Sequence, residues 1–144
     1  MATFSATDLN TKARFMGGYG NAVIVYGSVT PTAGALADVY RPLRIPAGML
    51  VTDLDIVNDK LDTGSAISAK IGYAPVDSDG PAASDAYFSA TSTFLATAGR
   101  KVCAFQPIKF EKDVYITLTL TAAATTFASG AATAIAKGQA EGVK

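Results

Sequence analysis

Two aspartates, Asp53 and Asp55, form the clearest pair of residues in this chain that could do chemistry. They alternate within a strand-like segment, so their side chains share one side, about 7 Å apart at strand rise. Two carboxylates at that separation could act as the acid and base of glycoside hydrolysis. Such an enzyme also needs a cleft and aromatic platforms for the sugar, and the chain contains 0 Trp. We therefore interpret the pair as solvated strand residues.

The composition removes most other kinds of active site. Ser-His-Asp and Cys-His catalysis both need an imidazole, and the chain has 0 His. The lone Cys103 cannot close an intrachain disulfide or build a structural zinc site. We expect no catalytic residue, no metal centre and no cofactor.

Short motifs that resemble ligand loops are incomplete. Residues 77–80 (Asp-Ser-Asp-Gly) begin like a calcium loop but lack the closing Glu, and Asp59 and Asp62 belong to a similar acidic turn. Turns capped by their own aspartates explain both better, with adventitious Ca²⁺ as the open alternative. The glycine-rich run 17–20 lacks the following Lys-Ser or Lys-Thr of a phosphate loop.

The charge balance indicates what kind of partner the chain has. Twelve basic residues match twelve acidic ones, so we expect binding neither to nucleic acid nor to an anionic membrane. Only 17 % of residues are charged while 49 % are hydrophobic, which indicates that part of the surface is covered in an assembly. No apolar run approaches the roughly 20 residues of a membrane span or resembles a signal peptide. We expect a soluble chain made and kept in a reducing cytoplasm.

The elements that would position these residues are mostly β-strands. Apolar and polar residues alternate with a period of two, and Gly and Pro separate the segments. We predict a buried strand at 22–29, an edge strand at 38–45 where Pro42 removes a donor, and further strands at 49–57, 67–73, 102–110, 113–121 and 131–137.

One segment reads differently from the rest. A set of residues recurs at a spacing of three or four, which predicts a short helix over residues 83–98: Ala83, Tyr87, Ala90, Phe94 and Ala98. Threonine at 91, 93 and 97 lowers helix propensity, so an irregular or strand-like course for part of the segment is the open alternative. The fold class is therefore an all-β antiparallel sandwich with one short inserted helix. A jelly roll is the preferred topology, and an immunoglobulin-like sandwich or another Greek key stays open. We expect an extended N-terminal arm (1–21), a sandwich domain (22–137) and a C-terminal tail (138–144).

Two sets of residues are candidates for protein contacts. Apolar side chains stud the predicted arm, which has no core of its own: Phe4, Leu9, Phe15, Met16 and Tyr19. We predict that they contact a partner protein or a sister subunit, unless the arm folds back as a strand of the same sandwich. The second set, Tyr115, Thr117 and Thr119, lies on the polar side of strand 113–121, where self-association is the hypothesis.

Several stretches together resemble small virion proteins of tailed bacteriophages. They are ATDLNTKARFMGGYGNAVIVYGSV, DVYRPLRIPAGMLVTDLDIVND, AKIGY, DAYFSATSTFLATAGR, FQPIKFEKDVYITLTLTAA and the glycine-bounded final strand. The chain is most similar to the cement, or head decoration, proteins of podovirus-type phages such as the Bordetella phage group.

This resemblance implies a non-enzymatic jelly-roll protein on the outer surface of the virion, made in the host cytoplasm. Its partners would be the major capsid protein, which has the HK97-like fold, and other copies of itself in a homodimer or trimer. The resemblance implies that the arm residues contact that capsid protein or a sister subunit. The alternative is a receptor- or glycan-binding sandwich of a phage fibre, because the fold alone does not choose between these roles. Tyr73 and Tyr87 near loops favour that alternative, and the missing Trp disfavours it.

Overall fold

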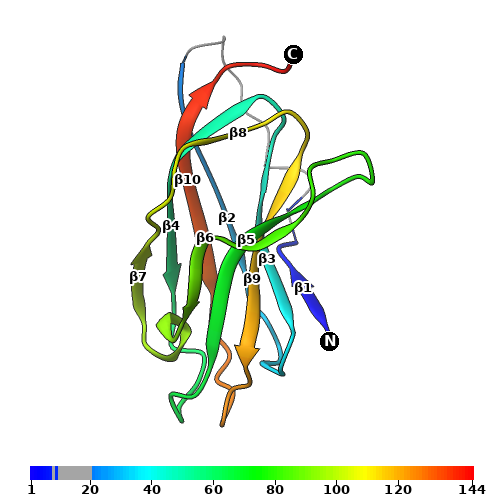
Figure 1. Cartoon of the computed structure of the whole chain (residues 1–144). Coiled ribbons are helices and arrows are strands. Elements are labelled where there is room, and N and C mark those ends of the chain that lie inside the picture. The colour runs from blue at the N-terminus through cyan, green and yellow to red at the C-terminus, as the bar shows by residue number, and fades with distance from the viewer. Residues whose placement is uncertain (8, 10–20) are drawn as a thin grey trace.

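Strands dominate residues 1–7, 9 and 21–144, which are the residues that the computed structural model describes. They form two five-stranded sheets packed as a sandwich (Figure 1). The first sheet has the order β1 (Thr3–Ser5), β3 (Val39–Ile45), β9 (Val114–Ala122), β5 (Ser68–Pro75) and β6 (Ser84–Ser92). The second has the order β2 (Ala22–Val29), β10 (Ala132–Ala140) and β4 (Met49–Asn58), and both β7 (Gly99–Val102) and β8 (Ile108–Phe110) pair with β4. The all-β sandwich predicted from the sequence is confirmed.

The period of two along the central strands produces the core. Ile116 and Leu118 of β9 and Leu54 and Ile56 of β4 are completely buried between the sheets. The intervening side chains point away from the core, as alternation on a pleated strand requires. Each sheet therefore has an inner apolar face and an outer face that is free to carry polar or docking residues.

The helix predicted over residues 83–98 is wrong. Most of that segment is β6, which pairs antiparallel with β5, and only a 3₁₀ turn, η1 (Phe94–Ala96), follows it. Pairing with β6 supplies hydrogen-bond partners along β5, and threonine and serine in the segment disfavour a helix. Phe88, which the helical spacing ignored, is the side chain that enters the core, with 1 % exposed. No helix in the described part of the chain has the length and apolarity that crossing a bilayer demands.

Both ends of the described chain belong to the sheets. β1 pairs with β3 in parallel, and β10 continues to Ala140, beyond the predicted strand end at 137. β10 passes very close to β4 at a register shift between Lys137 and Gly138, where a Cβ on Gly138 would lie 1.8 Å from the carbonyl oxygen of Leu50. Only glycine permits so close an approach of two backbones.

Candidate functional site

The outer face of the second sheet carries the most exposed apolar side chains of its strands. Ile24 and Tyr26 of β2 are 65 % and 64 % exposed, and Val102 of β7 is 65 % exposed. One cross-strand row runs across the four strands and contains, in order, Tyr26 of β2, Ile135 of β10, Asp55 of β4 and Val102 of β7. We call this surface the outer sheet face; it consists of Ile24, Tyr26, Asp53, Asp55, Val57, Arg100, Val102, Ile135 and Lys137.

The aspartate pair lies on this face, but the two carboxylates have different surroundings. Asp55 is only 7 % exposed, and its Oδ2 accepts a hydrogen bond of 2.7 Å from Nη1 of Arg100. Nζ of Lys137 lies 3.9 Å from the same oxygen. Asp53 is exposed and forms no ion pair with any described residue. The arrangement therefore holds Asp55 in an ion-pair cluster rather than offering an acid and a base to a substrate.

The outer face of the first sheet holds the predicted contact residues of strand 113–121. β9 lies between β3 and β5, and Thr117 is only 4 % exposed among its neighbours. The guanidinium carbon of Arg41 lies 4.9 Å from the ring centroid of Tyr115, a cation–π contact. Thr119 is half-buried beside Val39 and Lys70. A subunit-contact role for Tyr115, Thr117 and Thr119 stays a prediction.

The predicted arm residues divide into two groups. Phe4 belongs to β1 and packs edge-on against Tyr40, with ring centroids 5.8 Å apart. Leu9 is 7 % exposed and belongs to the core cluster. Phe15, Met16 and Tyr19 lie outside the described residues. Within the described part of the arm, the chain follows the alternative of folding back as a strand, and the capsid-contact role of the arm stays a prediction.

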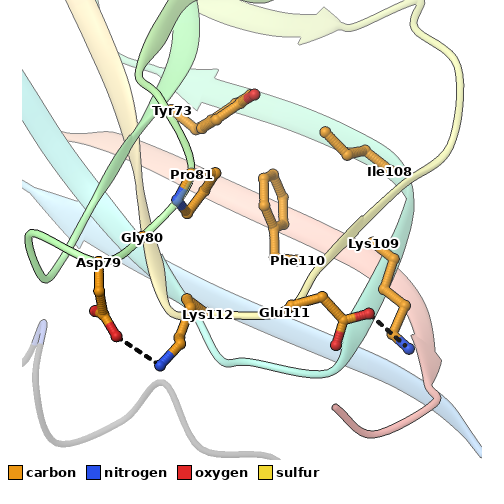
Figure 2. A pocket seen from close by; sticks show the side chains of 9 residues that line it. All are labelled: Tyr73, Asp79, Gly80, Pro81, Ile108, Lys109, Phe110, Glu111 and Lys112. Carbon is orange, nitrogen blue, oxygen red and sulfur yellow. Dashed lines mark hydrogen bonds and ion pairs between the residues drawn. The ribbon is translucent and has the colours of Figure 1, made fainter. Parts of the chain in front are cut away.

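A pocket of about 430 Å³ opens beside β8, where the loop after β5 meets the turn after β8 (Figure 2). Its apolar walls come from Tyr73, Pro81, Ile108 and Phe110. Two ion pairs stand at its rim: Nζ of Lys112 lies 2.7 Å from Oδ2 of Asp79, and Nζ of Lys109 lies 3.2 Å from Oε1 of Glu111. This lining suits an apolar side chain or a sugar ring, and it offers no nucleophile with a base beside it.

The ion pairs at the rim shift the pKa of three of the four groups, Asp79, Lys112 and Glu111. The hydrogen bond and the charge of Lys112 hold the pKa of Asp79 below its usual value, and the same contact raises the pKa of Lys112. The backbone N–H of Lys144 and the ammonium of Lys109 likewise lower the pKa of Glu111. The rim thus presents two basic and two acidic side chains to an incoming ligand.

Asp62, a candidate of the acidic turns, is used by the fold. Its side chain is fully buried and accepts hydrogen bonds of 2.7–3.2 Å from five backbone N–H groups: those of Gly64, Ala66, Ile67, Thr125 and Thr126. Burial alone raises the pKa of Asp62, but these hydrogen bonds outweigh it, and the pKa lies far below its usual value. The carboxylate thus joins the turn after β4 to the loop after β9, and its oxygens are occupied by donors rather than open to a cation. Among the described residues, no cluster of three or more His, Cys, Asp or Glu is placed to hold a metal ion.

The sequence analysis missed the outer sheet face because residues 22–29 were predicted to be a wholly buried strand. β2 is instead an edge strand with only Val25, Gly27 and Val29 buried. The signal was present in the alternation of Ile24 and Tyr26 with these residues, but a continuous run of apolar residues conceals a period of two.

Comparison with solved structures shows which proteins share this fold. A chain in the capsid of Ralstonia phage GP4 superposes with a TM-score of 0.74 at 20 % identity, covering 99 % of this chain and 100 % of that one. A chain of the cyanophage Pam1 capsid asymmetric unit gives 0.67 at 20 % identity over 88 % and 90 %. A chain in the acidic stable capsid of Helicobacter pylori bacteriophage KHP30 gives 0.58 at 13 % identity over 85 % and 90 %. No protein-family model and no curated protein matches the chain. At these identities the comparisons show a shared sandwich fold.

Proposed function

We propose that this chain is a non-enzymatic structural protein of a tailed-phage virion, and specifically a cement protein. In this role it binds the outer surface of the head and joins neighbouring major capsid subunits of HK97-like fold. The observation that carries the proposal is the end-to-end likeness to a chain in the capsid of Ralstonia phage GP4, which covers 99 % of this chain. The jelly-roll topology expected from the sequence belongs to the same proposal.

The described surface suits a protein that works by adhesion. Its outer faces are broad sheets, and the buried carboxylate of Asp62 joins the turn after β4 to the loop after β9. Equal numbers of acidic and basic residues avoid long-range repulsion between many copies placed close together. Cement function needs no reaction, only additional buried area across the seams between capsomers.

Many modest contacts would stabilise the head through repetition. A copy that is held at one contact meets the next at high effective concentration, so avidity exceeds the affinity of either contact. Because the chain would bind the assembled shell and not free subunits, it shifts the equilibrium toward the shell by mass action. The predicted arm, with Phe15, Met16 and Tyr19, is the proposed first contact with the capsid.

The test is to add the purified chain to phage heads stripped of accessory proteins and to image the particles by cryo-electron microscopy. We expect ordered density on the outside of the shell at capsomer seams. A matched variant in which Phe15, Met16 and Tyr19 are all serine should bind less, with unchanged thermal unfolding. Bare shells with the wild-type chain left free would exclude the cement role.

The pocket beside β8 favours one second candidate, a glycan-binding module of a phage fibre. Tyr73 and Pro81 give apolar surface against which a sugar ring could pack, and the charged rim offers hydrogen-bond partners. A glycan array is the direct test. Specific binding that is lost in Tyr73→Ala and kept in the control Tyr26→Ala would replace the cement proposal, and an array without hits would remove this candidate.

A further inference from the structure

We propose that the outer sheet face binds the same face of a second copy of this chain, so that two copies pack sheet against sheet. This deepens the homo-oligomer expected for a cement protein by assigning its surface. The dimer would form in solution, so its failure can be told apart from a failure to bind heads.

Apolar exposure is concentrated on this face. Ile24, Tyr26 and Val102 project from it with nearly two thirds of each side chain exposed, at 65 %, 64 % and 65 %. Ile135 and Val57 are half-buried between them in the cross-strand rows. A soluble monomer rarely gathers several such side chains on one flat surface, so a partner that covers them lowers the free energy.

The charges of the face favour a copy of itself over an acidic or a basic partner. Asp53 and Asp55 balance Lys137 and Arg100, so the face carries no net charge. A strongly charged partner would leave ions of one sign unpaired, whereas a second copy brings both signs in equal number.

The order of the rows makes the pairing specific. Ile24, Lys137 and Asp53 lie on one side of the row that contains Tyr26 and Ile135, and Val57 and Arg100 lie on the other. A two-fold axis along that middle row lays the Asp53 side of one copy on the Arg100 side of its partner. Asp53, which has no ion pair with a described residue, then gains a cation.

Shape points to the same occupant. A flat outer face is best matched by another sheet, and sheets pack about 10 Å apart with their side chains interdigitated. The outer face of the first sheet is a weaker competitor because, among the described residues, it carries no large apolar side chain as exposed as Ile24 or Tyr26. Four strands at a spacing of roughly 4.8 Å give a face only about 20 Å wide, so the contact is small. We therefore expect a dimer that dissociates on dilution.

The experiment is sedimentation velocity of the full chain over a dilution series, followed by three variants. Ile24→Lys and Val102→Lys place a cation on the outer sheet face. Leu36→Lys is the matched control, because Leu36 is 62 % exposed and lies before β3, away from the face. Thermal unfolding of each variant checks that it is folded, which is expected because all three side chains are already largely in solvent.

We expect the wild-type chain and Leu36→Lys to show the same monomer–dimer equilibrium, and each face variant to raise the dissociation constant at least tenfold. A fourth variant, Asp53→Lys, should also weaken the dimer, because it removes the predicted cross-copy ion pair. A wild-type chain that stays monomeric at every concentration would overturn the inference. So would a dimer that Ile24→Lys and Val102→Lys leave intact, including one that forms through β9.

Discussion

Replacing Phe88 with alanine should be among the most destabilising single substitutions in the chain. Its ring is 1 % exposed and lies edge-on to Phe105, Tyr87 and Tyr73, with centroid distances of 4.7, 5.2 and 6.2 Å. Deleting a buried phenylalanine ring removes its transfer free energy and leaves a cavity, at a cost of about 3 to 5 kcal/mol. For a domain of this size the loss corresponds to a fall in Tm of roughly 10 to 20 °C.

Tyr87→Ala is the informative comparison. A helix over this segment would bury Tyr87, whereas the strand buries its neighbour Phe88. In β6 Tyr87 is half-buried, and its hydroxyl donates to the carbonyl oxygen of Gln106 over 3.1 Å near the surface. We expect this variant to cost about 1 to 2 kcal/mol, well below Phe88→Ala. Urea unfolding followed by circular dichroism gives both free energies, provided that the m-values agree. If Tyr87→Ala proved the more costly, the reasoning that places β6 on the core through Phe88 would be refuted.

Three further outcomes follow from single groups. Asp62→Asn should destabilise the fold most above about pH 4, which is the pKa of an aspartate in the unfolded chain. The folded state lowers the pKa of Asp62, so the ionised carboxylate adds stability above that pH, and this stability is lost as the pH falls. The difference in Tm between variant and wild type, measured by calorimetry, should therefore narrow in acid, and a constant difference would contradict this. Tyr40→Phe should cost about 1 to 2 kcal/mol in urea unfolding, because the buried hydroxyl donates to the carbonyl oxygen of Ala33 over 2.7 Å; no loss would mean that this hydrogen bond is replaced. Burial raises the pKa of Cys103 to about 11, so little of the thiol is ionised and reactive in the native state. Iodoacetamide should label it slowly in the folded protein and rapidly in urea. Equal rates would show that the core around Cys103 opens to solvent in the folded protein.

Strands were predictable where one face is buried and the other is polar. The segments 49–57 and 113–121 correspond to Met49–Asn58 and Val114–Ala122, because their alternation leaves no second way to bury the apolar set. The edge strand inferred from Pro42 agrees in part with the structure, since β1 pairs with β3 only over Val39–Arg41. Beyond that point β3 is an edge only on its β1 side, because it stays paired with β9 over Leu43–Ile45, after a register shift that spans Pro42.

Other features depend on contacts between residues far apart in sequence, which spacing does not reveal. The helix prediction failed because the seven-residue spacing of Tyr87 and Phe94 fits a helical period, whereas the pairing of β6 with β5, which spacing does not reveal, makes the segment a strand. Asp62 could be recognised as a turn residue, but two of its five donors, Thr125 and Thr126, come from the other end of the sequence. The outer sheet face likewise arises only when β2, β10, β4 and β7 are aligned in register.

The position of β10 has a consequence for the order in which the chain can fold during synthesis. β10 lies between β2 and β4, so it is the sole described partner of β2 in the second sheet. While the ribosome is still adding residues up to 132, β2 has been made but its neighbour does not yet exist. The first sheet can assemble earlier, because β1, β3, β5, β6 and β9 all precede β10. The nascent chain must therefore carry an unpaired β2, with Ile24 and Tyr26, through most of translation, and the second sheet closes only when the last strand emerges.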